Sequence, residues 1–440
     1  MFLRGRMKMA DYKLKRTDSK RTGDYYLSCK HPSGLNIYIY PKTDFRTTYA
    51  IFGAHYGSID SQFKRSDEES VTRVPDGIAH YLEHKLFESE DGDAFARFAK
   101  TGANANAYTS FDQTCYLFSA TENVYDSLEI LLDFVQKPYF TEETVAKEQG
   151  IIGQEIRMYD DDPGWRVMFN LLEGMYFTHP IKKDVAGTVE SIAKITPEYL
   201  YSCYNTFYNL NNMSLVIAGN INPNLVLEMC DKMLKPSEPV TVSRIFDEEP
   251  DEVVEHYKEQ KLSVGIPIFE YGFKEDVSGG SADEKTIATT EILLEIIASD
   301  ASPLFLKLYN EELINEASFG YDFFEGDGYA ATIFSGESTD PQRVAEEINK
   351  EIKRLRTEGI DENDFEVAKK SLYGANIQGL NSSSSIANAM ISLEFRNREI
   401  FTYIDSFASI TLKDVENRLN ELMREDKAVL SVILPSEENI

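Results

Sequence analysis

The chain has 440 residues, of which 42% are hydrophobic and 12% aromatic, enough for two or three globular domains with buried cores. Its formal net charge is −29, which argues against nucleic acid and anionic membrane surfaces as partners and favours basic peptide segments. The four cysteines are scattered and contain no Cys-x-x-Cys pair, which predicts reduced thiols in a cytoplasmic protein.

The first 21 residues are basic, unlike the rest of the chain. Lysine and arginine dominate this stretch, and only Asp11 and Asp18 oppose them. It lacks the apolar core of a signal peptide, and no run in the chain approaches transmembrane length. We therefore expect residues 1–21 to form a flexible basic tail.

Strand and helix patterns alternate through the first half of the chain. Runs of β-branched and aromatic residues at 35–40 and 49–58 predict strands, and the polar residues 61–75 predict a loop. Further along, we expect strands at 116–120 and 213–219 and amphipathic helices at 122–135 and 165–175.

Residues 77–88 predict a helix that carries a metal site. Asp76 is available as the N-cap, and apolar residues recur at helical spacing. His80 and His84 are four residues apart and therefore share a helix face, and Glu83 falls on the same side. Two imidazoles at this spacing are half of a zinc site, and a neighbouring carboxylate can act as general base. The order His-x-x-Glu-His is the inverzincin arrangement.

A catalytic zinc needs a third protein ligand, and the best candidates lie in residues 140–158. Thr141, followed by two glutamates and a helical apolar period, predicts a helix there. Glu148 and Glu155 are two turns apart and share a face. In so acidic a protein, two solvated glutamates explain this pair more simply, so the residues alone do not establish a ligand.

Together, these motifs resemble the pitrilysin family of zinc peptidases, which includes insulin-degrading enzyme and the mitochondrial processing peptidases. In that family, His-x-x-Glu-His is completed by a downstream glutamate, with a second glutamate seven residues before it. The resemblance implies that His80, His84 and Glu155 bind zinc, that Glu83 is the general base, and that Glu148 supports the site.

A second motif extends the resemblance. Residues 104–109, Asn-Ala-Asn-Ala-Tyr-Thr, are similar to the strand beside the active site in this family, which implies that Asn104, Ala105 and Asn106 bind substrate. The amino-acid sequence of residues 148–163 is most similar to that of the bacterial single-unit members.

Residues 236–258 are acidic and proline-bearing, which predicts a linker between a zinc-bearing domain at 22–235 and a second domain at 259–440. Ser-Ile-Ala-Lys-Ile-Thr at 191–196 matches Ser-Phe-Ala-Ser-Ile-Thr at 406–411, and a later strand at 215–218 matches 430–433 at the same offset. We therefore expect an α+β chain of two homologous domains, each an antiparallel sheet with helices packed on one face.

The second copy lacks the zinc residues. Lys370 stands where the repeat places Glu148, and Ile377 stands opposite Glu155. We therefore expect the C-terminal domain to be non-catalytic.

The chain departs from its family in one respect. Active members often carry an arginine and a tyrosine, seven residues apart in a late domain, that grip the substrate backbone. No arginine lies between Arg244 and Arg343, so Tyr321 is left as the candidate for substrate binding.

The sequence predicts a zinc-dependent endopeptidase subunit that hydrolyses unfolded or extended peptides inside a closed chamber of two chains. The missing arginine favours a heterodimer with a homologous partner, and a homodimer is the alternative. A non-catalytic peptide-binding or scaffolding subunit of a heterodimeric processing protease is another interpretation, as is a protein with a structural zinc. The intact His-x-x-Glu-His motif argues against a non-catalytic subunit, and Glu83 would have no role beside a structural zinc.

Overall fold

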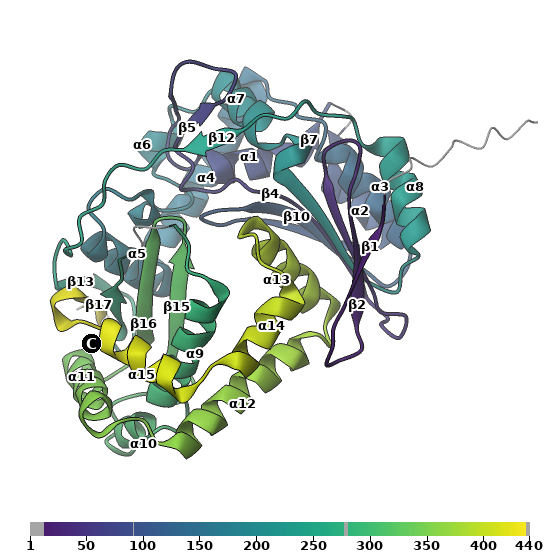
Figure 1. Ribbon diagram of the computed structural model, residues 1–440. Coiled ribbons are helices and arrows are strands. Elements are labelled where there is room, and N and C mark those ends of the chain that lie inside the picture. The colour runs from purple at the N-terminus through teal and green to yellow at the C-terminus, as the bar shows by residue number, and fades with distance from the viewer. Residues whose placement is uncertain (1–12, 91, 277–279, 437–440) are drawn as a thin grey trace, which may run out of the picture. The chain divides into compact units, whose positions relative to one another are not determined.

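The computed structural model describes residues 13–90, 92–276 and 280–436 (Figure 1). The chain divides into two compact units. Unit 1 comprises Met1–Ile151, Val185–Ile245 and Gly379–Ile400, and unit 2 comprises Ile152–Asp184, Phe246–Gln378 and Phe401–Ile440. Part of each half of the chain thus belongs to the unit built mainly from the other half.

A seven-stranded sheet in the order β1-β2-β3-β11-β4-β10-β9 forms the frame of unit 1. All its pairs are antiparallel except β3 with β11. The strands are β1 (Lys15–Asp18), β2 (Tyr25–Lys30), β3 (Asn36–Pro41), β4 (Thr48–Ala54), β9 (Asn104–Thr109), β10 (Thr114–Ala120) and β11 (Met213–Gly219).

Helices cover both faces of this sheet. Tyr116 on β10 contacts Phe134 of α3 (Val124–Phe134), with ring centroids 5.7 Å apart. Phe52 on β4 pairs with Tyr116, and the next residue, Gly53, points to the opposite face. A Cβ at Gly53 would lie 2.8 Å from Ile391 of α13 (Ser383–Phe395), so α13 covers that opposite face.

The prediction of a flexible tail at residues 1–21 is wrong for residues 15–18. These residues form β1, which pairs with β2 along its whole length. The Arg16 guanidinium lies 3.7 Å from the centre of the Tyr25 ring and also pairs with Asp18. A basic strand can therefore join the sheet because its charge has local partners. Residues 1–12 of the expected tail lie outside the described residues.

Unit 2 is built on a five-stranded sheet in the order β13-β17-β14-β16-β15. One face of this sheet packs against α9 (Glu284–Ala298), α11 (Pro341–Glu358) and α15 (Leu412–Glu421), and the side chains between them form the hydrophobic core of the unit. The other face contacts α5 (Pro163–Met175), since a Cβ at Gly272 would lie 2.5 Å from Met175. The strands are β13 (Tyr257–Leu262), β14 (Ile268–Lys274), β15 (Gly320–Gly326), β16 (Tyr329–Glu337) and β17 (Ala428–Pro435).

The two sheets share one connectivity. In each, a parallel pair is followed by three antiparallel pairs: β3-β11-β4-β10-β9 in unit 1 and β13-β17-β14-β16-β15 in unit 2. The predicted α+β repeat is therefore confirmed. Each sheet differs from the expected antiparallel sheet with helices on one face, because it contains a parallel pair and a helix, α13 in unit 1 or α5 in unit 2, lies on its second face.

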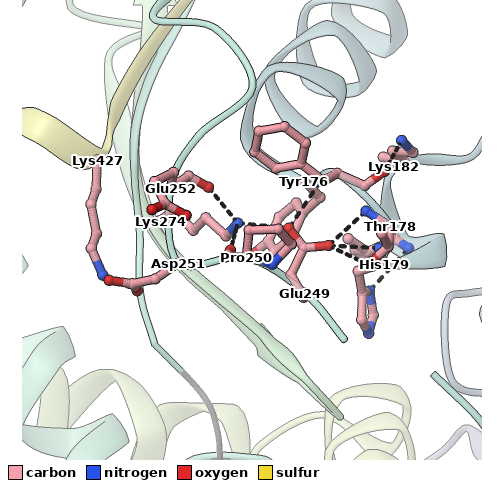
Figure 2. Close-up of polar contacts among 12 residues, drawn as sticks. Tyr176, Thr178, His179, Lys182, Glu249, Pro250, Asp251, Glu252, Lys274 and Lys427 are labelled. Carbon is pink, nitrogen blue, oxygen red and sulfur yellow. Dashed lines mark hydrogen bonds and ion pairs between the residues drawn. The ribbon is translucent and has the colours of Figure 1, made fainter. Parts of the chain in front are cut away.

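Part of the stretch predicted as a linker is bound tightly to unit 2 (Figure 2). The Glu249 carboxylate accepts hydrogen bonds from the backbone N–H groups of residues 177–179, at 2.7–2.9 Å, and from Lys274 Nζ at 2.7 Å. Burial alone raises the pKa of Glu249, but these donors outweigh it and lower the pKa to about 2. An acidic stretch need not be mobile where its carboxylates find donors.

The remaining elements include the two helices that carry the candidate metal ligands, α1 (Ile78–Leu86) and α4 (Glu142–Asp160). The others are β5 (Gln62–Arg65), β6 (Thr72–Arg73), β7 (Glu88–Ser89), β8 (Gly92–Asp93), β12 (Val242–Arg244), α2 (Ala94–Thr101), α6 (Val189–Ile192), α7 (Pro197–Phe207), α8 (Pro223–Met233), α10 (Pro303–Asn310), α12 (Glu362–Gly379), α14 (Ile400–Ser409) and the 3-10 turns η1 (Pro180–Lys182), η2 (Leu210–Asn212) and η3 (Glu425–Lys427). Within the described part of the chain, no helix is both long enough and apolar enough to cross a bilayer.

Candidate metal centre

Helix α1 starts at a position that only glycine can occupy. Gly77 precedes the helix with a φ of 87°, and a Cβ there would lie 2.3 Å from the Ala186 carbonyl oxygen. The sequence placed Asp76 at the N-cap, and this is wrong, because Gly77 is the cap residue and no side chain bonds there. The Asp76 carbonyl instead accepts a hydrogen bond from Ser191 Oγ at 2.8 Å.

Nearly every residue of α1 is buried, so its side chains have little freedom. His80 is 7% and Glu83 8% exposed. The His80 and His84 rings lie 4.6 Å apart between centroids, at an angle of 69°. The Tyr81 hydroxyl donates to the Val145 carbonyl and ties α1 to α4. The two imidazoles are therefore held side by side on a rigid helix.

Helix α4 supplies the partner of one histidine. It begins as predicted, with the Thr141 hydroxyl accepting from the Thr144 N–H at 3.2 Å. Glu148 lies 3.1 Å from His84 Nδ1, and this hydrogen bond lowers the pKa of Glu148 although burial opposes it. When the Nδ1–H of His84 donates to Glu148, Nε2 is the ring nitrogen that carries the lone pair a metal requires.

Glu155, on the same continuous helix, completes a set of possible ligands. One ligand atom each from His80, His84 and Glu155 can be chosen so that all three lie within 4.8 Å of one another. A tetrahedral zinc with bonds of about 2.1 Å places its ligand atoms about 3.4 Å apart. A small movement of the three side chains toward one another would therefore bring their ligand atoms to zinc-binding positions. Two imidazoles and one carboxylate are a catalytic zinc set that leaves a position for water. The residues present therefore fit zinc.

A hydroxyl from β9 holds the expected general base. Thr109 Oγ1 donates to Glu83 Oε2 at 2.7 Å. The sequence placed Thr109 in the strand motif without a role. This contact joins residues 26 positions apart, so nothing in their spacing could have indicated it.

The three predicted substrate-binding residues lie on β9, an edge strand. Among the described strands, β9 pairs only with β10. Asn104 and Asn106 are exposed, and Ala105 is half-buried between them. The structure therefore presents one side of the β9 backbone for pairing.

Tyr321 lies on β15 of unit 2, where its hydroxyl donates to Glu295 of α9 and its ring packs on the core of that unit. Its role in substrate binding stays a prediction.

Tyr159 is a site residue that the sequence analysis missed. Its hydroxyl donates to Glu155 Oε1 at 2.7 Å. The signal was available, because residues four apart on a helix face one another.

The loop histidine His179 has a structural role, because its ring lies at hydrogen-bonding distance from two backbone groups. Its Nδ1 accepts from the Ile181 N–H at 3.1 Å, and its Nε2 lies 3.0 Å from the Asp327 carbonyl oxygen. Among the residues that the structure describes, the set of His80, His84 and Glu155 is the one group of three or more ligand side chains at metal-binding distance.

Family models match most of the chain. The model described as insulinase, peptidase family M16, matches residues 71–189, and the model described as the peptidase M16 inactive domain matches residues 194–372. The first match contains all the candidate metal ligands.

Individual relatives agree with these matches. YmfH of Bacillus subtilis, named an uncharacterized zinc protease, is 41% identical over 411 residues, which is 92% of this chain and 96% of YmfH. A crystal structure of a putative M16-like peptidase from Alicyclobacillus acidocaldarius is similar with a TM-score of 0.88 at 33% identity, covering 97% of this chain and 99% of that one. A probable mitochondrial-processing peptidase subunit beta of Arabidopsis thaliana is 28% identical over 181 residues, which is 40% of this chain and 34% of that protein.

Proposed function

Because this chain belongs to the M16 peptidase family, we propose that it is the zinc-dependent endopeptidase subunit that its motifs predict. The observation that carries the proposal is the grouping of His80, His84 and Glu155, with Glu83 on the same helix as both histidines. A structural zinc would leave Glu83 without a task.

His80, His84 and Glu155 would hold the zinc, which when bound supplies Lewis acidity at the scissile carbonyl and lowers the pKa of water. The Glu83 carboxylate accepts a proton from the attacking water and then donates it to the departing amine. The Thr109 hydroxyl, bonded to Glu83 Oε2, orients this carboxylate.

The proposed substrate is an extended peptide added to β9 as a further strand. Main-chain groups along Asn104, Ala105 and Asn106 would pair with the peptide backbone, which supplies affinity with little dependence on side chains. The net charge of −29 favours basic segments in that peptide.

We further propose that the working enzyme contains a second, homologous chain that closes a chamber around the peptide. An arginine clamp for the substrate backbone is missing between Arg244 and Arg343, and a partner could supply it. The name of the Arabidopsis relative, which calls it a subunit, is compatible with such an assembly. We place the protein in the cytoplasm because all four cysteines are free and buried.

A non-catalytic peptide-binding subunit is the second candidate, favoured by the same missing arginine. The substitution Glu83→Gln distinguishes the two, because it keeps the shape of the base and removes its function. We expect zinc content to stay at one per chain while hydrolysis of a fluorogenic peptide falls by about 10²- to 10⁴-fold. The exposed Glu90 is the matched control, and Glu90→Gln should change neither value.

The assay is run on this chain with a homologous partner present. A Glu83→Gln variant that cleaves the peptide at the wild-type rate would contradict the proposed mechanism. A wild-type chain that binds zinc and peptide but never cleaves would support the non-catalytic alternative.

A further inference from the structure

The candidate ligand Glu155 has a dedicated partner one helical turn away on α4. Tyr159 donates its phenolic hydroxyl to Glu155 Oε1 at 2.7 Å. A hydrogen bond to a carboxylate is among the stronger kinds in proteins and fixes the orientation of its acceptor. This contact fixes the position of Oε1 relative to α4.

The Tyr159 ring is itself held in place. It stacks on Trp165 with centroids 4.6 Å apart and planes 16° from parallel. Trp165 Nε1 donates to Asp184 Oδ2 at 2.6 Å, and its backbone N–H is capped by Asp162 at 2.8 Å. The Tyr159 side chain therefore cannot turn away from Glu155 without breaking an aromatic stack that α5 holds rigidly.

This arrangement matters because a glutamate side chain has more rotatable bonds to fix than a histidine side chain. His80 is buried and His84 is held by Glu148, whereas Glu155 is half-buried and has three rotatable side-chain bonds. Fixing a carboxylate before the metal arrives removes the entropy cost of ordering it on binding. Partners of this kind typically contribute 10- to 100-fold to metal affinity.

We propose that Tyr159 is a positioning residue for the zinc ligand Glu155, and that Trp165, stacked on it, is a built-in optical reporter of metal binding. The inference rests on the proposed zinc centre. Trp165 is the single tryptophan of the chain, so all tryptophan emission comes from a residue in contact with Tyr159.

The test is a zinc titration of the metal-free full chain. Calorimetry measures the zinc affinity, and Trp165 fluorescence reports whether binding changes the tryptophan emission. Tyr159→Phe keeps the ring and its stack but removes the hydroxyl. We expect this variant to bind zinc about 10- to 100-fold more weakly than wild type, with unchanged thermal stability of the metal-free protein. Tyr199→Phe, at a tyrosine that is 38% exposed on α7, is the matched control and should bind zinc like wild type.

Three results would overturn the inference. A Tyr159→Phe affinity equal to that of wild type shows that the hydroxyl does not position Glu155. Saturation by zinc without any change in Trp165 emission removes the reporter role. Failure of the wild-type chain to bind zinc refutes the metal centre itself, and the positioning role with it.

Discussion

Three of the four side chains at the candidate centre, those of Glu83, His84 and Glu155, are oriented by side chains outside it. Glu148 bonds to His84, Thr109 to Glu83 and Tyr159 to Glu155. Metal sites depend on such outer contacts, because a ligand that must be ordered on binding contributes less affinity. At the residue scale, the site is therefore a set of pairs whose members can be tested separately.

Thr109→Val is the most specific of these tests. Valine keeps the shape of threonine and its β-strand preference but cannot donate to Glu83. We expect zinc affinity to be unchanged and kcat for peptide hydrolysis to fall by about tenfold, since one oriented hydrogen bond contributes about 1–1.5 kcal/mol. A kcat equal to wild type, measured at saturating peptide, would show that Thr109 does not position the base.

The sequence identified His80, Glu83 and His84 because helical spacing is a local property. The grouping of Glu155 with them was predicted only through resemblance, since the residues alone allowed two solvated glutamates. Thr109 was missed because its contact with Glu83 depends on how β9 packs beside α1, which no local pattern encodes. Tyr159 was missed although its spacing from Glu155 was available.

A buried carboxyl elsewhere makes the stability of unit 2 depend on pH. Burial raises the pKa of Glu270 on β14 to about 8, and one of its carboxyl oxygens has no hydrogen-bond partner within the described structure. The folded state therefore keeps a proton that the unfolded chain releases above about pH 4.3. Below that pH, this difference in protonation does not change the free energy of unfolding. As the pH rises, the free energy of unfolding falls by up to about 1.4 kcal/mol per pH unit, and the loss levels off above the pKa of the folded state.

Glu270→Gln should remove this cost. We expect the variant to gain stability over wild type as the pH rises from 5 to about 8, measured by chemical denaturation at several pH values. Glu346→Gln is the control, since the Glu346 side chain is 63% exposed. Equal stability of Glu270→Gln and wild type at pH 5 and at pH 8 would show that Glu270 is ionised in the folded protein.

At the scale of elements, glycine at the start of α1 fixes where the metal helix begins. The pattern of residues 77–88 was sufficient to predict the helix, and the structure places it at Ile78–Leu86. Its entry was mispredicted because Asp76 is a common cap type, whereas the close approach of the Ala186 carbonyl admits only glycine at position 77.

Gly77→Ala should therefore disturb the candidate zinc centre, although Gly77 is not a ligand, because it changes how the metal-bearing helix α1 begins. A methyl group there both strains a backbone φ of 87° and meets the Ala186 oxygen at 2.3 Å. We expect a loss of about 2–4 kcal/mol in stability and weaker zinc binding. Gly102→Ala is the matched control, with a φ of 78° and open space around the added methyl, and should lose only the backbone part, about 1 kcal/mol. Equal losses in the two variants would show that the contact with Ala186 does not matter.

At the scale of the whole molecule, two homologous units have diverged in chemistry. Their sheets share one strand connectivity, and the repeat was visible in the sequence because residues 191–196 and the strand at 215–218 match the second half at one offset. The exchange of α5 and α13 between the halves was not visible, because periodicity shows that a helix has an apolar face but not which sheet that face covers.

The absence of an arginine clamp leads to a prediction about assembly. Peptide hydrolysis by this chain should be weak alone and should rise on adding a homologue that carries the Arg–Tyr pair but lacks the zinc histidines. Adding the same homologue with its arginine changed to lysine should restore less activity, because lysine does not reproduce the planar donor fork. Full activity of the single chain, unchanged by the partner, would favour the homodimer.

We propose that α1 and α4 together form one catalytic zinc centre. X-ray absorption spectroscopy of the zinc-loaded full chain tests it most directly, because it counts the imidazoles and measures the bond lengths. We predict one zinc per chain with two imidazole nitrogens and one carboxylate oxygen at about 2.0–2.2 Å, plus one water, and loss of the oxygen contribution of the protein in Glu155→Ala. A zinc held by four protein ligands, or a spectrum unchanged in Glu155→Ala, would rule out this catalytic centre.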